Sequence, residues 1–175
     1  VALALFEQCA AQGWVLDGVV SQSLAQTRAL WRLREDISET LWHWQPYKND
    51  ISVRVSKMSD FLAEVDQLVA ARYPDFEIVW YGHIGDGNLH LNILKPEDLP
   101  QTEFFERCGI VSLEIGELLA RYGGSISAEH GVGLLKKSLL PYSRSPVEIA
   151  LMRSIKKTFD PKSILNPGKV FDALV

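Results

Sequence analysis

Apolar residues recur at intervals of three and four along much of the chain, and this spacing predicts amphipathic helices. In one long segment Leu24, Leu30, Ile37 and Leu41 recur near this spacing, with charged residues between them. Gly13 follows the first apolar segment at a position where a left-handed residue commonly ends a helix. The pattern predicts helices over residues 1–12, 22–41, 59–72, 104–121 and 147–158.

Other segments alternate apolar with polar residues, or are short and apolar, and these patterns predict strands. The predicted strands cover residues 14–20, 51–55, 76–84, 88–94 and 125–127. Because strands are spread between helices and include one clear hairpin, we expect an α+β fold. Its antiparallel sheet would carry helices on one face, as in ferredoxin-like folds, and would not be doubly wound.

The chain has 175 residues, a length that predicts roughly one domain. It contains no internal repeat, low-complexity tract or flexible linker. It begins at Val1 within a predicted helix and without an initiator methionine, so we expect it to be part of a longer protein.

The sequence Trp80 to Asn92 carries the most informative pattern, because Asp86-Gly87 separates two alternating runs. Asp-Gly is a strong signal for a two-residue hairpin turn. That turn would place His83 opposite His90 and Tyr81 opposite Asn92, all four on one side of the sheet. The other side would be an apolar face made of Trp80, Ile84, Leu89, Leu91 and Ile93.

Two opposed histidines can bind one metal ion, because cross-strand Cβ atoms lie roughly 4.5–5.5 Å apart. His83 and His90 are two of only four histidines in the chain, which favours this hypothesis. The alternative is a pair of histidines on a solvated strand face with nothing bound.

Glu129-His130, within a glycine-rich segment at residues 124–133, could supply the carboxylate that such a site needs. In an extended segment adjacent side chains point to opposite sides, so we expect Glu129 and His130 to take two different roles. Two histidines, a glutamate and an open position suit a divalent ion that acts as a Lewis acid. The alternative is a helix-capping or surface glutamate. The chain has no GxGxxG or Walker motif, so an independent nucleotide site is unsupported. It also has no HExxH or GxSxG motif.

Composition and charge narrow the class of partner. Apolar residues make up 47% of the chain, charged residues 23%, and the net charge is −4. This acidic balance gives no reason to expect nucleic acid or an anionic membrane as a partner. No apolar run approaches the length of a membrane helix. The two cysteines, Cys9 and Cys108, form no CxxC pattern, so we expect a reducing, cytoplasmic location.

Four motifs together resemble the C-terminal domain of FAD-linked oxidases and dehydrogenases of 2-hydroxy acids, which are vanillyl-alcohol-oxidase-type flavoproteins. The resemblance covers nearly all of the chain in order, and the D-2-hydroxyglutarate dehydrogenase-like branch looks closest. The motifs are Trp31-Arg32-Leu33-Arg34-Glu35, residues 47–53, residues 82–90 and residues 128–133, followed by Asp160-Pro161 and Asn166-Pro167-Gly168-Lys169.

This resemblance implies that residues 1–175 form the substrate- and metal-binding domain, with an FAD-binding domain upstream. In the family the two hairpin histidines and the glutamate bind zinc or manganese, which here corresponds to His83, His90 and Glu129. Asn166 would contact the flavin. The chain alone would then fold without turning over substrate.

The resemblance also implies a set of substrate contacts. Arg34 and Lys48 would bind carboxylates, Arg34 through a bidentate fork and Lys48 as a point charge. Ser38, four residues after Arg34, would contact the distal carboxylate of the substrate. Asn92 and His130 would contact substrate as well, and His130 is the candidate general base for the hydroxyl proton.

The sequence departs from the family pattern at two positions, both near the proposed substrate contacts. Arg54 stands in the predicted strand where relatives generally have proline, and Asn49 replaces the residue that usually follows the lysine. These departures bear on which acid is bound rather than on the reaction.

The implied function is oxidation of a D-2-hydroxy acid, of the D-2-hydroxyglutarate or D-lactate type, to the 2-oxo acid with hydride transfer to FAD. A separate electron acceptor would reoxidise the flavin and could hold the protein at a membrane surface, and a homodimer is left open. Two alternatives are a metal-dependent hydrolase and a non-catalytic binding or dimerisation module of the same fold. Hydrolysis without added flavin would favour the first, and the absence of metal would favour the second.

Overall fold

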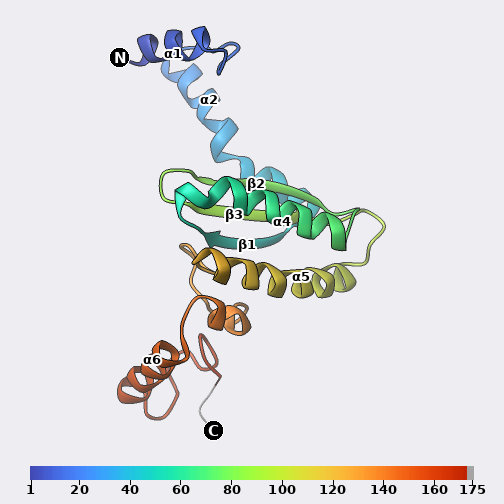
Figure 1. The fold of residues 1–175 in the computed structure, drawn as a ribbon, viewed down its shortest axis with the longest axis vertical. Helices are drawn as coiled ribbons and strands as arrows, with labels where there is room; N and C mark the ends of the chain where they lie inside the picture. The colour runs from blue at the N-terminus through green and yellow to red at the C-terminus, as the bar shows by residue number, and fades with distance from the viewer. Residues whose placement is uncertain (173–175) are drawn as a thin grey trace. The chain divides into compact units, whose positions relative to one another are not determined.

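The computed structural model of the protein describes residues 1–172 (Figure 1). The chain divides into two compact units, residues 1–43 and the segment that begins at Trp44.

The first unit is helical. It contains α1 (Ala2–Ala11), α2 (Leu24–Glu35) and α3 (Ile37–Leu41). Gly13 has a φ of 71°, which confirms the predicted end of the first helix. The long helix predicted over residues 22–41 is divided at Asp36, and the Ser23 side chain caps α2 by accepting the Gln26 N–H.

The strand predicted over residues 14–20 is wrong, because the structure has irregular backbone there. Leu16, Val19 and Val20 are exposed, and none pairs with a neighbouring strand. A strand needs such a partner for its backbone N–H and C=O groups.

The second unit is built on a three-stranded sheet in the order β1-β3-β2, with both pairings antiparallel. The strands are β1 (Tyr47–Ser52), β2 (Glu77–His83) and β3 (Asn88–Leu94). With α4 (Met58–Arg72) and α5 (Gln101–Tyr122), the chain follows the β-α-β-β-α order of a ferredoxin-like unit. The strand predicted at residues 125–127 is reduced to one bridge, between Ser125 and Ser52. These elements confirm the predicted α+β class.

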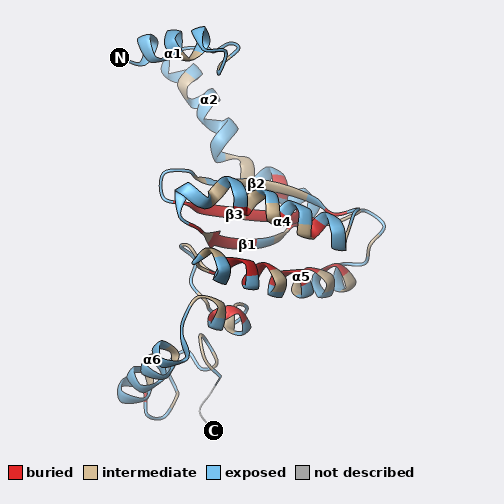
Figure 2. Ribbon diagram, viewed as in Figure 1, coloured by how far each residue is buried: buried red, intermediate tan, exposed pale blue. Residues whose placement is uncertain are grey.

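The core lies between the sheet and the helices α4 and α5, and Figure 2 shows buried residues along β1, β3 and α5. Figure 1 shows these two helices beside the strands. The most buried core residues are Ile51, Phe61, Val65, Val69, Leu91, Ile93, Phe104, Cys108, Val111, Ile115, Leu118, Leu119 and Ile126. The other face of the sheet is therefore left for polar residues.

The first strand is shifted toward the N-terminus relative to the prediction over residues 51–55. Its pairing with β3 ends at Ser52, opposite Asn88, because β3 begins there. The N–H of Val53 then donates to the Gly87 carbonyl, and the chain enters a short 3-10 helix, η2 (Val55–Lys57). Arg54 has a φ of −58°, which proline also adopts, so either residue fits this backbone.

The C-terminal part of this unit contains the 3-10 helix η3 (Lys137–Tyr142) and α6 (Pro146–Phe159). A capping box between Ser145 and Glu148 begins α6, as each side chain bonds the backbone of the other residue. Among the described residues, no helix combines the length and the low polarity that crossing a membrane requires.

Candidate functional site

The hairpin between β2 and β3 has a four-residue turn, residues 84–87, in place of the predicted two-residue turn. The pairs are therefore His83 with Asn88 and Tyr81 with His90, so the predicted register is wrong by two residues. The amides of Asp86 and Gly87 both donate to the His83 carbonyl, and this pattern closes the longer turn.

A shift of two residues keeps each side chain on its predicted side of the sheet, because side chains alternate with a period of two. Leu89, Leu91 and Ile93 are buried in the core as predicted. Ile84 is the exception, since it lies in the turn and is 78% exposed. The opposite face, called the polar face below, consists of Lys48, Asp50 and Ser52 of β1, Asn88, His90 and Asn92 of β3, and Val79, Tyr81 and His83 of β2.

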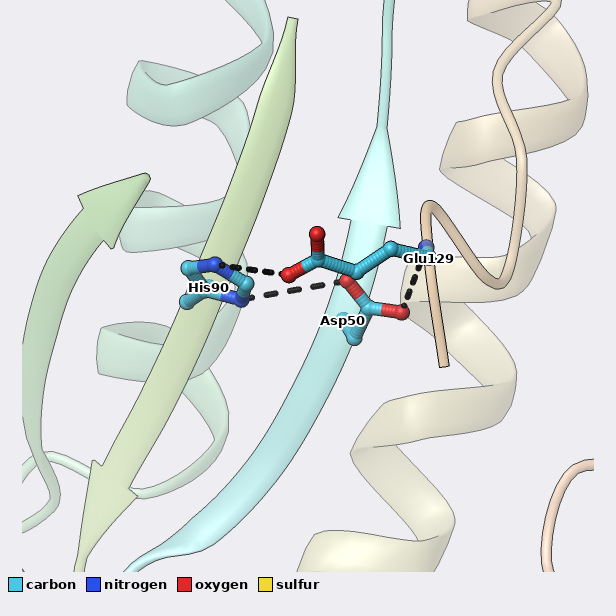
Figure 3. Close-up of side chains that lie close together, drawn as sticks. All are labelled: Asp50, His90 and Glu129. Atoms are coloured by element: carbon cyan, nitrogen blue, oxygen red, sulfur yellow. Dashed lines mark hydrogen bonds and ion pairs between the residues drawn. The ribbon is translucent and has the colours of Figure 1, made fainter. Parts of the chain in front are cut away.

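Three residues on or next to the polar face form a cluster that could hold a metal ion: Asp50, His90 and Glu129 (Figure 3). The Nε2 atom of His90 lies 3.5 Å from Oε1 of Glu129, and its Nδ1 atom lies 3.8 Å from Oδ1 of Asp50. The imidazole thus stands between two carboxylates. Each of the three residues offers one atom, and these atoms lie within 4.8 Å of one another.

Asp50 holds the loop that carries Glu129. Its Oδ2 atom accepts the backbone N–H of Glu129 at 3.0 Å and that of His130 at 2.9 Å, and it lies 3.3 Å from the Ser127 hydroxyl, which donates to it. Burial alone would raise the pKa of Asp50, but these amides and the nearby Lys136 ammonium outweigh it and hold the pKa below its ordinary value.

The amides of Glu129 and His130 converge on one oxygen of Asp50, and this bends the backbone between them. The expectation that their side chains point to opposite sides is therefore wrong. They do not point to opposite sides, because the Nε2 atom of His130 lies 3.6 Å from Oε1 of Glu129. The His130 ring also stacks on the His90 ring, with centroids 5.9 Å apart. Both residues therefore face the cluster.

The side chain of His90 is only 14% exposed, whereas that of His130 is 65% exposed. The rings of Tyr81 and His83 lie 4.9 Å and 5.6 Å from the His90 ring. Burial lowers the pKa of His90, and although Asp50 and Glu129 oppose this effect the net direction is downward. His90 is therefore held toward its neutral form, which is the form that binds metals.

Lys136 is a cation beside the cluster, and its side chain is only 16% exposed. Its Nζ atom donates to the Asp50 carbonyl at 2.9 Å and lies 3.8 Å from Oδ2 of Asp50. Burial lowers the pKa of Lys136, partly offset by Asp50. The charge of the Asp50 carboxylate is thus balanced within the protein.

Asn92 and Lys48, both predicted to bind substrate, are direct cross-strand partners on the polar face. Asn92 is 1% exposed, and its Nδ2 atom donates to the carbonyls of His90 and Val79. Asn49 lies on the core face instead, where its Nδ2 atom is 3.5 Å from the Ser112 hydroxyl on α5. The Asn49 side chain therefore lies on the opposite side of the sheet from Lys48 and Asn92.

The remaining predicted residues lie elsewhere in the chain. Arg34 and Ser38 belong to the first unit, at the end of α2 and in α3. Asn166 follows α6 with a φ of 47°, and its carbonyl accepts the Lys169 N–H. Their roles stay predictions.

Asp50 and Lys136 belong to the site but are not predicted from the sequence. One signal could have found Asp50: aspartate is rare within strands, and this one lies between Asn49 and Ile51, which alternate with it. Nothing comparable marks Lys136, which reaches the site through tertiary structure alone.

The sequence of the chain is similar to those of a known protein family. Residues 2–170 match the family described as FAD linked oxidases, C-terminal domain. The chain is 61% identical over 172 residues to the D-2-hydroxyglutarate dehydrogenase of Stutzerimonas stutzeri, covering 98% of this chain and 37% of that protein. It is 57% identical over 171 residues to the D-2-hydroxyglutarate dehydrogenase of Xanthomonas citri pv. viticola, covering 98% of this chain and 36% of that protein.

A more distant relative is the mitochondrial D-2-hydroxyglutarate dehydrogenase of Rattus norvegicus, 38% identical over 170 residues, which are 97% of this chain and 30% of that protein. The chain therefore spans about a third of the length of the curated relatives it matches. Because the family match extends over almost all of its residues, the chain belongs to the C-terminal domains of FAD-linked oxidases.

Proposed function

We propose that this chain is the substrate-binding part of an FAD-dependent dehydrogenase that oxidises a D-2-hydroxy acid, D-2-hydroxyglutarate in the first instance, to the 2-oxo acid. The observation that most strongly supports this proposal is the cluster of Asp50, His90 and Glu129, which lies next to Lys48 and Asn92 on the polar face. The names of the relatives support the choice of acid.

The facing donor atoms of His90 and Glu129 fit a divalent metal ion. Two ligands bound tetrahedrally to zinc at about 2.1 Å would lie roughly 3.4 Å apart. The His90 and Glu129 atoms that face each other are 3.5 Å apart. Among the described residues, the buried side-chain atoms without a hydrogen-bond partner are the Oδ1 atoms of Asp50, Asn88 and Asn92, all on the polar face.

Buried acceptors of this kind favour a cationic or donating ligand. As the family resemblance implies, we assign His83, His90 and Glu129 as the residues that would hold zinc or manganese. His83 lies beside the cluster rather than in it, with its ring centroid 5.6 Å from that of His90. A divalent ion bound there would polarise the substrate hydroxyl and carboxylate oxygens.

The chain's own groups provide binding and proton transfer. The His130 side chain is 65% exposed and borders the cluster, so it can accept the hydroxyl proton of a bound substrate. Lys48 and Asn92 would bind the carboxylate nearest the reacting carbon. Arg34 and Ser38 would bind the distal carboxylate, which distinguishes a hydroxyglutarate from a lactate.

FAD would be bound chiefly by another part of the full-length protein, with Asn166 as a contact from this chain. It would accept the hydride from the carbon that bears the hydroxyl group. As that hydride leaves and His130 takes the hydroxyl proton, the carbon–oxygen single bond becomes the carbonyl of the 2-oxo acid. A separate electron acceptor would be needed to complete the turnover.

The test is a dye-reduction screen of the full-length protein with D-2-hydroxyglutarate, D-lactate, D-malate and glycolate. We expect the highest kcat/KM with D-2-hydroxyglutarate. His130→Ala should lower kcat by about 10²–10⁴-fold, the range for a lost general base. Flavin content serves as the control and should not change. Equal turnover of the His130→Ala variant would overturn the base assignment, and ester hydrolysis without flavin would favour a metal-dependent hydrolase instead.

A further inference from the structure

We propose that Asp50 is a positioning residue that orients both the histidine and the glutamate of the metal site, without itself being a ligand. One carboxylate oxygen holds the Glu129 loop, and the other determines which ring nitrogen of His90 carries the proton. This inference rests on the proposed metal site but does not depend on which substrate is oxidised.

The first part concerns the Glu129 loop. The Oδ2 atom of Asp50 accepts two successive backbone amides, those of Glu129 and His130, at 3.0 Å and 2.9 Å. The hydroxyl of Ser127 donates to the same oxygen. Both amides donate to the same oxygen of Asp50. If the loop straightened, both amides would lose this acceptor. Asp50 thereby sets where the Glu129 carboxylate stands.

The second part concerns the His90 ring. Its two nitrogens face two different carboxylates, Nδ1 toward Asp50 at 3.8 Å and Nε2 toward Glu129 at 3.5 Å (Figure 3). A neutral imidazole carries one proton. If Nδ1 carries the proton, the lone pair of Nε2 points toward Glu129. A cation bound between them would then contact both His90 and Glu129.

The Oδ1 atom of Asp50 is suited to receive that proton. It is buried, and within the described part of the chain it has no hydrogen-bond partner. A closure of about 0.8 Å would bring it to hydrogen-bond distance from Nδ1 of His90. A carboxylate behind a metal-binding histidine commonly fixes the tautomer and the ring orientation.

Burial and charge argue that Asp50 is not itself a ligand. Its side chain is 4% exposed, whereas that of Glu129 is 45% exposed. Its Oδ2 atom already has three donors. The ammonium of Lys136, 3.8 Å from Oδ2, balances its charge and would repel a dication there.

The first experiment compares Asp50→Asn with Glu129→Gln in the FAD-loaded full-length protein. Zn²⁺ affinity is measured by competition with a chelator. We expect Asp50→Asn to weaken binding by about 10–100-fold, the range for residues behind the ligands, and Glu129→Gln to weaken it more. Asp98→Asn, which removes the same charge from an exposed loop, should leave the affinity unchanged.

Co²⁺ bound in place of Zn²⁺ distinguishes a positioning residue from a ligand. The cobalt d–d spectrum of Asp50→Asn should keep the wild-type band pattern, while that of Glu129→Gln should change. Wild-type Zn²⁺ affinity in Asp50→Asn would overturn the proposal. An equal loss of affinity with equally altered spectra would show that Asp50 is a ligand and overturn it too.

A second measurement needs no change at Asp50, so it remains decisive if that variant fails to fold. Nitrogen NMR of the metal-free protein with labelled histidine reports the tautomer of His90, assigned by comparison with His90→Gln. A proton on Nδ1 is expected, and a proton on Nε2 would contradict the proposal. If the wild-type protein binds no metal, the proposed metal site is wrong. The NMR measurement would still test whether Asp50 determines the tautomer of His90.

Discussion

Asp50 of β1 lies directly opposite His90 of β3, in an antiparallel pairing that places both side chains on the polar face of the sheet. The same register sets Tyr81 of β2 against the other side of His90. One cross-strand row thus provides a carboxylate, an imidazole and an aromatic ring. Glu129 reaches this row from a loop 79 residues after Asp50, and Asp50 itself holds that loop.

Metal retention should depend most on His90. We expect His90→Gln in the full-length protein to weaken Zn²⁺ binding by more than about 100-fold, because a direct ligand counts for more than a residue behind it. His83→Gln should weaken binding less, since the His83 ring lies edge-on and 5.6 Å from that of His90. Elemental analysis after dialysis against a chelator measures both.

His43→Gln is the matched control for these variants, because His43 is not part of the cluster of Asp50, His90 and Glu129. It should retain the wild-type metal content. Equal retention of metal by His90→Gln and His43→Gln would contradict the assignment of His90.

The hairpin turn should tolerate alanine at Gly85 but not at Gly87. Gly87 has a φ of 77°, and a Cβ there would lie 1.9 Å from the Val53 carbonyl oxygen. A non-glycine residue in this region costs about 1–3 kcal/mol even without a clash. Gly85 has open space around its Cβ position. Urea unfolding should show a lower free energy of unfolding for Gly87→Ala than for Gly85→Ala, and equal values would refute the turn geometry.

The two cysteines should differ in reactivity. Burial raises the pKa of the Cys108 thiol to about 12, and its side chain is fully enclosed in the core. Cys9 is half-buried in α1. Because the thiolate is the reactive form, iodoacetamide should alkylate Cys9 in the native protein and reach Cys108 only after unfolding. Peptide mapping checks this, and native labelling of Cys108 would contradict the packing of α5.

The loop after α6 should loosen in acid. A hydrogen bond from Lys156, assisted by the amides of Ile164 and Leu165, lowers the pKa of Asp160 despite its burial. The pKa of Asp160 is lower in the folded protein than its ordinary value of 3.8, so the ionised carboxylate stabilises the loop at any pH above 3.8. This stabilisation is lost as the pH falls through the pKa that Asp160 has in the folded protein.

Hydrogen exchange of the Ile164 and Leu165 amides, corrected for intrinsic rates, should therefore accelerate as the pH is lowered from about 7 to about 2. Asp160→Asn should show fast exchange throughout this range. Exchange of the wild-type amides that does not respond to pH would contradict the role of Asp160.

The sequence predicted the faces of the hairpin better than its register. Period-two alternation assigns His83 and His90 to the polar face, and a register error of two residues leaves that assignment intact. The length of the turn could not be predicted, because it depends on the contact of Gly87 with Val53 in another segment. The strand over residues 14–20 failed for a related reason, since alternation cannot reveal whether a partner strand exists.

The arrangement of Glu129, His130 and Lys136 could not be predicted either, because it depends on contacts between residues far apart in the sequence. Glu129 and His130 were expected to diverge because an extended backbone was assumed. The bend that brings them together depends on a hydrogen-bond acceptor 79 and 80 residues away, on Asp50. Lys136 likewise becomes part of the site only through its contacts with the carbonyl and the carboxylate of Asp50.

Anaerobic reduction of the bound flavin is the measurement that tests the proposed function most directly. The full-length protein is mixed with D-2-hydroxyglutarate in the absence of any electron acceptor, and the flavin absorbance is followed. We predict that the flavin is bleached, that the L enantiomer leaves it oxidised, and that 2-oxoglutarate forms in equal amount. A flavin that stays oxidised with every D-2-hydroxy acid would contradict the proposed function.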